Sequence, residues 1–336
     1  MPADASVSIA GLELKNPVIA GSGEATMTRD GIRAALAAGA AAVVAKSVNE
    51  SEAARRQLET AEYVLLDPDW RPLPWGPAPR TASLYCRSGL PAEPFDRWAD
   101  MLAECDEEAR RRDAYVVGSL IVADVERTVD MARTFEAAGL RWLELNIGAP
   151  HAEEASPGAI RAEREPAAVE ELVAPVRRAV DVPLTVKLSG QGDPLPAAQA
   201  AWAAGADAIC LAGRHLGFLP DPSTRRPVLG TFGAIGGAWA LPLTLRWIAK
   251  ARIRFGPGRP TIGTNGARSG EDVIRFLLAG ASAVQMTTAL FTDGPRSLEG
   301  AVRQVEAYLS EHRVTARAII GEATDHVVTY EEVAGG

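Results

Sequence analysis

Residues 195–212, LPAAQAAWAAGADAICLA, place an Ala-rich helical stretch directly before a glycine and a short apolar run. Glycine adopts the left-handed conformation at a helix C-terminus at little cost, so Gly205 is expected to end a helix and lead the chain into a strand. The same junction recurs as Ala-Gly-Ala at 38–40 and 279–281, and as Ala-Gly-Leu at 138–140. This alternation is typical of parallel βα units.

Eight such units follow one another along the 336 residues. Strands are expected at 18–21, 41–46, 115–120, 142–146, 184–188, 208–212, 260–264 and 283–287. The helices that follow them are expected at 29–38, 93–111, 125–138, 166–180, 195–204, 242–255, 270–279 and 297–312. Eight units, with no Gly-x-Gly-x-x-Gly after the first strand, favour an α/β fold of the (β/α)8 barrel type over an open doubly wound sheet.

Several segments lie outside these units. Residues 7–9 and 12–14 flank Ala10-Gly11 and predict a β-hairpin at the bottom of the barrel. Segment 49–92 is too long for an ordinary βα loop and rich in Pro and Trp, which predicts a lid. Long insertions at 147–165 and 213–240 also follow strands, on the face where barrels carry active sites. With 313–336 as a C-terminal tail, we expect one domain over 1–336.

The composition excludes several classes of protein. A net charge of −8 and a pI near 5.2 disfavour nucleic-acid binding, which depends on clustered Lys and Arg. The longest uncharged apolar run, 34–45, is too short to cross a bilayer. The first residues lack the features of a secretory signal, so a cytoplasmic location is expected. The Ala- and Arg-rich, Lys-poor composition is typical of a GC-rich bacterial genome.

The three cysteines, Cys86, Cys105 and Cys210, are well separated and show no Cys-x-x-Cys spacing. Their number and spacing argue against a disulfide framework, a structural zinc site or an iron–sulfur cluster held by this chain alone. We therefore expect reduced thiols and no metal.

Lysine is rare, with four lysines among 35 basic residues. Two of them, Lys46 and Lys187, fall at the ends of the second and fifth predicted strands. A cation in a barrel mouth is costly to desolvate unless it faces an anion. That anion would be a cofactor or substrate, or else a carboxylate at a strand end such as Glu144, and both alternatives stay open.

Glycine-rich segments end the sixth, seventh and eighth units. They contain Gly236-Gly237, Gly263-Thr264-Asn265-Gly266 and Thr287-Thr288. Such strand ends, opening onto helix N-termini, present free backbone N–H groups, and loops after strands seven and eight are the usual phosphate site of barrels. Any one segment alone is explained by turn formation. Together they predict a cofactor or substrate that carries a phosphate.

Further phrases accompany these segments in a fixed order. They are Asn16-Pro17, Ala20-Gly21-Ser22-Gly23, Ala45-Lys46-Ser47, Ser88-Gly89-Leu90-Pro91, Glu144-Leu145-Asn146, Val186-Lys187-Leu188, Ile235-Gly236-Gly237-Ala238 and Gln285-Met286-Thr287-Thr288-Ala289-Leu290. In this combination the chain resembles, over nearly its whole length, the dihydroorotate dehydrogenase family, including the flavin-binding barrel of dihydropyrimidine dehydrogenase.

The resemblance implies FMN as the cofactor, lying across the barrel mouth. The residues it implies around the phosphate are Gly237, Gly266, Thr287 and Thr288, and those lining the isoalloxazine are Lys46, Ser47, Asn146 and Lys187. Ala20, Gly21, Ser22, Gly236, Gly263, Thr264 and Asn265 complete the implied cofactor set. The family chemistry is hydride transfer between flavin N5 and a ring C–C bond, with Lys187 stabilising negative charge on the reduced flavin.

The chain departs from the family where the proton is moved. The family phrase after the fourth strand reads Asn, two residues, Cys or Ser, then Pro, and the Cys or Ser is the general base. Here the phrase reads Asn146-Ile147-Gly148-Ala149-Pro150-His151. Ala149 cannot move a proton, and general acid–base catalysis contributes about 10²- to 10⁴-fold. We therefore expect a substrate other than dihydroorotate.

Two residues are candidates for the missing proton transfer. His151 matches the dihydropyrimidine dehydrogenase pattern and has a side-chain pKa naturally near neutrality; the alternative is a loop histidine that only hydrogen-bonds. Cys86 aligns with the Asn that precedes the family's Gly-Leu-Pro lid phrase, and its alternative role is packing. The expected catalytic set is therefore Lys187, His151 and Cys86.

The expected substrate contacts are Lys46, Asn146, His151, Arg87, Arg214 and His215. Among them the arginines suit bidentate recognition of a carboxylate, with solvated loop charges as the alternative. The first hypothesis is an FMN-dependent oxidoreductase acting on a C–C or C=C bond of a small cyclic molecule. The second is a non-redox flavin enzyme or a catalytically silent FMN-binding subunit. Because no NAD-binding fingerprint is present, we consider an electron-transfer partner protein, and also a homodimer.

Overall fold

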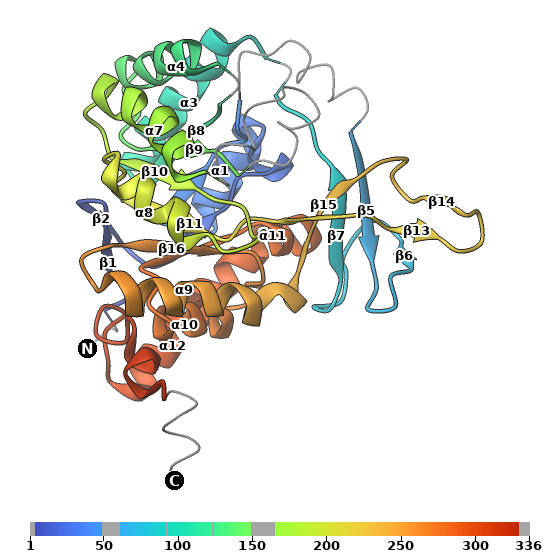
Figure 1. The fold of residues 1–336 in the computed structure, drawn as a ribbon. Helices are drawn as coiled ribbons and strands as arrows, with labels where there is room; N and C mark the ends of the chain where they lie inside the picture. The colour runs from blue at the N-terminus through green and yellow to red at the C-terminus, as the bar shows by residue number, and fades with distance from the viewer. Residues whose placement is uncertain (1–3, 49–60, 92, 123, 149–164, 329–336) are drawn as a thin grey trace.

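A closed barrel of parallel strands forms the centre of the molecule in the computed structural model, which describes residues 4–48, 61–91, 93–122, 124–148 and 165–328 (Figure 1). Its strands are β3 (Val18–Ala20), β4 (Ala42–Val44), β8 (Tyr115–Ile121), β9 (Leu143–Asn146), β10 (Leu184–Lys187), β11 (Ala208–Leu211), β16 (Thr261–Thr264) and β17 (Ala283–Met286). Each strand pairs with its neighbours in chain order, and β17 closes the barrel against β3. The predicted (β/α)8 barrel is confirmed.

Helices surround this barrel. They are α1 (Arg29–Ala37), α3 (Phe95–Arg110), α4 (Val125–Ala137), α7 (Pro166–Ala179), α8 (Leu195–Ala203), α9 (Leu241–Phe255), α10 (Gly270–Leu278) and α12 (Arg296–His312). The predicted helices are confirmed to within two residues at each end. Gly39, Gly139, Gly205 and Gly280 have φ values of 91°, 104°, 97° and 110°, so the recurring junction is a glycine in the left-handed region of φ.

The barrel strands are apolar on both faces because helices cover the outside and side chains fill the inside. Val18, Ile19, Val186 and Val284 are all completely buried. A few polar side chains interrupt this core from inside the barrel, among them Ser119, Glu144 and Gln285. They form part of the candidate active site described below.

The predicted N-terminal hairpin is confirmed as β1 (Val7–Ile9) and β2 (Leu12–Leu14), which pair antiparallel. The turn residues Ala10 and Gly11 both have positive φ, 53° and 77°, as a tight two-residue hairpin turn requires. Figure 1 shows this hairpin on the opposite side of the barrel from the inserted strands.

Two insertions that the sequence presents separately combine into one sheet beside the barrel mouth (Figure 1). Its strands, in spatial order, are β12 (His215–Gly217), β15 (Gly233–Gly237), β7 (Ser83–Arg87), β5 (Glu62–Leu66) and β6 (Pro72–Leu73). A small hairpin, β13 (Pro220–Asp221) with β14 (Arg226–Pro227), extends from it. The described part of the predicted lid 49–92 therefore supplies three strands of this sheet, β5, β6 and β7, and the two insertions join where β7 pairs with β15.

Short helical turns complete the description: η1 (Glu24–Thr26), η3 (Ala238–Ala240), α11 (Thr288–Asp293) and η4 (Glu322–His326). The start of the predicted C-terminal tail packs on the barrel, because the Ala316 amide donates to the Asp4 carbonyl at 3.0 Å and Ile319 is buried. No described helix combines the length and the apolar character that crossing a bilayer requires.

Candidate active site

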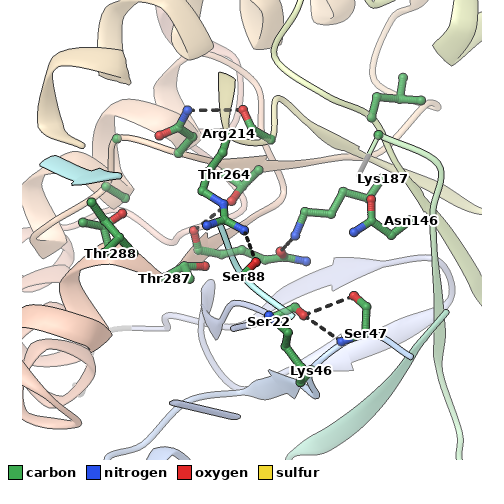
Figure 2. Close-up of a pocket in the computed structure, with 18 of the residues that line it drawn as sticks. Ser22, Lys46, Ser47, Ser88, Asn146, Lys187, Arg214, Thr264, Thr287 and Thr288 are labelled. Atoms are coloured by element: carbon green, nitrogen blue, oxygen red, sulfur yellow. Dashed lines mark hydrogen bonds between the residues drawn. The ribbon is translucent and has the colours of Figure 1, made fainter. Parts of the chain in front are cut away.

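A pocket opens at the carboxyl ends of the barrel strands, beneath the inserted sheet (Figure 2). It contains about 970 Å³ of space free of protein atoms, part of it open to solvent. The polar residues lining it are Ser22, Lys46, Ser47, Ser88, Asn146, Lys187, Arg214, Thr264, Asn265, Arg268, Gln285, Thr287 and Thr288. Leu84, Gly89 and Leu90 approach from β7 and the segment that follows it.

The structure brings most of the predicted site residues together. Those lining the pocket are Ser22, Lys46, Ser47, Asn146, Lys187, Arg214, Gly237, Thr264, Asn265, Gly266, Thr287 and Thr288. Ala20, Gly21, Gly236 and Gly263 are chain neighbours of this lining. Cys86, Arg87 and His215 are described but do not line the pocket. Ala149 and His151 lie outside the described residues.

Lys46 is held by a carboxylate that the sequence did not single out. Its Nζ donates to Glu24 Oε1 at 2.6 Å, and the Tyr63 hydroxyl donates to the same oxygen. Burial opposes ionisation of Glu24, but the charges of Lys46 and Arg214 and these hydrogen bonds hold its pKa below the usual value. The pair is therefore ionised, and it connects η1, β4 and β5 at the edge of the pocket.

Lys187 is positioned by a network inside the barrel. Its Nζ donates to Gln285 Oε1 at 2.7 Å and lies 3.6 Å from Glu144 Oε1. The Gln285 side-chain amide in turn donates to Glu144 Oε2 at 2.6 Å. The carboxylate partner considered for this lysine is therefore present, and the ammonium still projects into the pocket (Figure 2).

The same network continues to the opposite strands through hydroxyl groups. Ser119 Oγ donates to Glu144 Oε1 at 3.2 Å, and Ser47 Oγ lies 2.8 Å from Ser119 Oγ. Ser22 Oγ accepts from the Ser47 amide at 3.2 Å. Hydrogen bonds thus run from the end of β3 to β17, so several pocket side chains are fixed before any ligand enters.

The glycine-rich end of the pocket contains buried donors without acceptors. Arg268 is 8% exposed, and its Nη2 donates to Thr292 Oγ1 at 2.9 Å and to Asp293 Oδ2 at 3.1 Å. Its Nε and Nη1 are buried with no partner among the described residues. An unpaired buried guanidinium nitrogen is costly, so this end of the pocket suits a strongly accepting anion such as a phosphate.

Close backbone approach explains the glycines here. A Cβ at Gly266 would lie 2.6 Å from backbone atoms of Leu241, and one at Gly21 would lie 2.2 Å from Thr287 Oγ1. Gly266 also has a φ of 115°. The chain therefore needs glycine at these positions to shape the pocket wall.

Arg214 enters the pocket from the segment between β11 and β12. Its Nη1 donates to Cys86 Sγ, and its Nη2 donates to Ser88 Oγ at 3.4 Å. Burial opposes its charge, but the nearby Glu24 carboxylate favours the charged form and the pKa of the guanidinium is raised, so it stays a cation. Burial raises the pKa of the Cys86 thiol, which is completely buried in β7.

The other two predicted recognition residues lie on the inserted sheet. Arg87 forms an ion pair with Glu62, with 3.8 Å between Nη2 and Oε2. The His215 ring lies 5.6 Å from that of Trp239, and burial lowers the pKa of His215. Arg214 therefore lines the pocket, whereas Arg87 and His215, which the sequence grouped with it, do not.

Several residues of the site escaped the sequence analysis, among them Glu24, Tyr63 and Arg268. Glu24 follows the Ala20–Gly23 phrase, and Arg268 lies inside the glycine-rich seventh unit, so each had a signal by position. Tyr63 had none, because its role depends on where β5 packs.

Comparison with known proteins places this geometry in a family. Residues 74–309 match the family model described as Dihydroorotate dehydrogenase. The chain belongs to the dihydroorotate dehydrogenase family.

Similar proteins carry the description dihydroorotate dehydrogenase B (NAD(+)), catalytic subunit. The one from Thermoplasma acidophilum is 28% identical over 313 residues, covering 93% of this chain and 95% of that protein. The one from Methanopyrus kandleri is 33% identical over 289 residues and covers 84% of each. The one from Pelobacter propionicus is 30% identical over 332 residues, covering 94% of this chain and 96% of that protein.

Membership confirms the expected enzyme class and cofactor. The chain is an FMN-dependent oxidoreductase acting on CH–CH groups. The pocket also fits FMN independently of the comparisons. The Nε and Nη1 groups of Arg268 have no acceptor among the described residues and lie beside the glycine-rich wall, where they suit a phosphate. The identities of the substrate and of the electron partner are separate questions.

Proposed function

We propose that this enzyme transfers a hydride between FMN and a C–C or C=C bond of a small cyclic substrate other than dihydroorotate. The observation that carries the proposal is a contrast. The cofactor side of the pocket has its buried donors and the fixed Lys187 ammonium, whereas the position of the family's general base is Ala149.

The cofactor contacts follow from the pocket lining. We assign the phosphate to Arg268, Gly266, Thr287 and Thr288, with Gly237 beside them, and the ring system to Ser22, Lys46, Ser47, Asn146 and Lys187. Ala20, Gly21, Gly236, Gly263, Thr264 and Asn265 form the supporting wall. FMN, when bound, supplies the hydride acceptor or donor.

Lys187 provides electrostatic stabilisation. Its ammonium is held by Gln285 at 2.7 Å, which leaves further N–H donors for the pocket. A cation fixed in advance stabilises negative charge that develops during the reaction without reorganising at that moment.

We assign proton transfer to His151. Ala149 has no ionisable group, and His151 follows two residues later. Cys86 is a weaker candidate because its thiol is completely buried and has a raised pKa. Cys86 contacts Arg214 but does not itself line the pocket.

An electron-transfer partner is part of the proposal. The relatives are described as catalytic subunits of an NAD(+)-dependent enzyme, and this sequence contains no dinucleotide-binding fingerprint. We propose that a second protein exchanges electrons between FMN and NAD.

The loss of a base at position 149 also favours a second candidate, an FMN-binding subunit without redox turnover. The two differ in whether a substrate can reduce the bound flavin.

The deciding experiment begins with the absorbance spectrum of the purified protein and chromatography of the cofactor released by heat. Anaerobic mixing with dihydroorotate, dihydrouracil and other saturated cyclic compounds then tests flavin reduction by stopped-flow absorbance. We expect bound FMN, reduction by at least one compound, and only slow reduction by dihydroorotate. Rapid reduction by dihydroorotate contradicts the substrate assignment, and a flavin that no compound reduces supports the second candidate.

Two variants test the assigned roles. Lys187→Ala and His151→Ala are both expected to slow flavin reduction by about 10²-fold or more. Wild-type rates in both variants would contradict these roles. Arg133→Gln, on the exposed face of α4, is the matched control and should leave the rate unchanged.

A further inference from the structure

The two lysines of the pocket are held by different groups. Lys187 Nζ makes its short contact, 2.7 Å, with the neutral amide oxygen of Gln285, and the nearest oxygen of Glu144 is 3.6 Å away. Lys46 Nζ makes its short contact, 2.6 Å, with a carboxylate oxygen of Glu24. Because Coulomb attraction weakens with distance, the charge of Lys46 is balanced more closely by the protein than the charge of Lys187.

The Glu24 carboxylate lies behind the Lys46 ammonium and not in the pocket wall. Lys46 lines the pocket, and Glu24 does not. The two side chains are 7% and 19% exposed, respectively, so the ion pair is largely shielded from water and is screened less than a surface pair. Glu24 therefore acts on a pocket ligand through Lys46 and through its own charge, without touching the ligand.

Tyr63 fixes the carboxylate from the inserted sheet. Its hydroxyl donates to Glu24 Oε1, the same oxygen that accepts from Lys46. Burial and the charge of Glu24 raise the pKa of Tyr63, so the hydroxyl keeps its proton and remains the donor. The charges of Lys46 and Arg214 outweigh the effect of burial and keep the pKa of Glu24 low. One ionised carboxylate thus faces two cations and one neutral donor.

We propose that Glu24 is a positioning residue that sets the reduction potential of the bound flavin by holding and partly neutralising the Lys46 ammonium. This inference rests on the proposed function, which assigns Lys46 to the ring system. Negative charge accumulates on that ring system when FMN is reduced; a fixed cation stabilises this charge, and a carboxylate beside the cation opposes the stabilisation. Glu24 therefore makes the potential more negative than Lys46 alone would, which favours the passage of electrons from reduced FMN to an acceptor.

The test is the midpoint potential of the full-length FMN-loaded protein, measured at pH 7 by slow anaerobic reduction beside a reference dye, without substrate. Glu24→Gln leaves the charge of Lys46 unbalanced and should favour the reduced form by roughly 10-fold, about 30 mV more positive for a two-electron couple. Glu24→Asp keeps the charge and should stay close to wild type. Tyr63→Phe removes a neutral donor but leaves the carboxylate, so it should not raise the potential.

Variants of Lys46 separate this inference from the proposed function. Lys46→Gln removes the cation and should make the potential more negative, whereas Glu24→Gln combined with Lys46→Gln removes both charges and should return it towards wild type. Because the double variant leaves no unbalanced buried charge, it replaces Glu24→Gln if that variant does not retain FMN. The double variant should then have a more positive potential than Lys46→Gln.

Arg303→Gln is the matched control, because it removes an arginine whose side chain is 70% exposed on α12. Its potential should equal that of wild type. The absorbance spectrum and the melting temperature show that each variant is loaded and folded.

The possible failures are distinguishable. A wild-type protein that retains no FMN, or a Lys46→Gln variant with an unchanged potential, contradicts the proposed assignment of Lys46 and overturns this inference with it. A shift in Lys46→Gln without one on substitution of Glu24 by Gln overturns this inference alone. It is also overturned if Glu24→Asp or Tyr63→Phe raises the potential as much as Glu24→Gln, because the effect would then come from packing and not from charge.

Discussion

At the residue scale, the cations of this pocket differ in whether the protein satisfies all of their buried donors. Lys46 and Lys187 are fixed by Glu24 and Glu144, so their charges are largely balanced within the protein. Arg268 retains buried donors without acceptors. A ligand that supplies those acceptors gains their hydrogen bonds without first having to displace protein groups.

Arg268→Gln is therefore expected to weaken FMN binding by roughly 10- to 100-fold, because hydrogen bonds from a charged donor contribute about 1.5–3 kcal/mol. The measurement is the quenching of FMN fluorescence on titration of protein from which FMN has been removed. Arg133→Gln is the control. An unchanged dissociation constant in Arg268→Gln would remove the phosphate assignment from this residue.

A second prediction at the residue scale concerns the Glu24 carboxylate and the dependence of stability on pH. Burial opposes ionisation of this carboxylate, but the charges of Lys46 and Arg214 hold its pKa below the usual value for a glutamate. The ionised form therefore stabilises the folded state above the unfolded-state pKa, and this contribution is lost as the pH falls through the lower folded-state pKa.

Unfolding in urea at several pH values tests this. The free energy of unfolding of wild-type protein should fall as the pH drops below about 4.5, and Glu24→Gln should show a smaller fall over the same interval. Because breaking a buried ion pair costs about 3–5 kcal/mol when one partner is left charged, Glu24→Gln should also be less stable at pH 7. An identical pH profile in the two proteins would show that Glu24 is not a source of this dependence.

At the element scale, close contacts between strands and helices decide which glycines are required. β16 packs on α10, and a Cβ at Gly263 would lie 2.2 Å from Phe276 Cδ1, a ring that is completely buried. On α12, a Cβ at Gly300 would meet nothing within 4 Å. One glycine is thus fixed by packing and the other is not.

Gly263→Ala is expected to destabilise the protein by about 1–3 kcal/mol through overpacking. Gly300→Ala, the matched control, should be neutral or stabilising by up to about 1 kcal/mol, because alanine favours a helix over glycine. Chemical denaturation measures both. Equal effects of the two substitutions would contradict the packing explanation.

The elements also show which parts of the fold local sequence patterns can predict. The eight barrel strands and their helices were predicted because each depends on local periodicity and on a glycine junction a few residues away. The sheet beside the mouth was not, because β7 and β15 pair across about 150 residues of chain, with Tyr85 opposite Ile235. Nothing local in either segment identifies the other as its partner.

At the whole-molecule scale, cofactor binding should couple to global stability. The pocket to which we assign FMN is lined by segments as distant in the chain as Ser22 and Thr287. A ligand that binds only the folded state adds about 2.7 kcal/mol at a concentration 100 times its dissociation constant. Removing FMN should therefore lower the melting temperature measured by calorimetry, and adding it back should restore it. A melting temperature independent of FMN would contradict a cofactor site built from the whole barrel.

The barrel was predictable from the chain alone, because it follows from repeated local βα units. The short phrases at strand ends carried the family resemblance, and that resemblance implied FMN and many of the residues that line the pocket. Which charged side chains meet was not predictable in this way. In the fold Lys46 pairs with Glu24, Tyr63 bonds to the same carboxylate, and two buried donors of Arg268 have no acceptor among the described residues. Arg214 lines the pocket, whereas Arg87 and His215 do not. Charge pairing depends on distances between segments far apart in the chain, and a linear pattern contains no such distances.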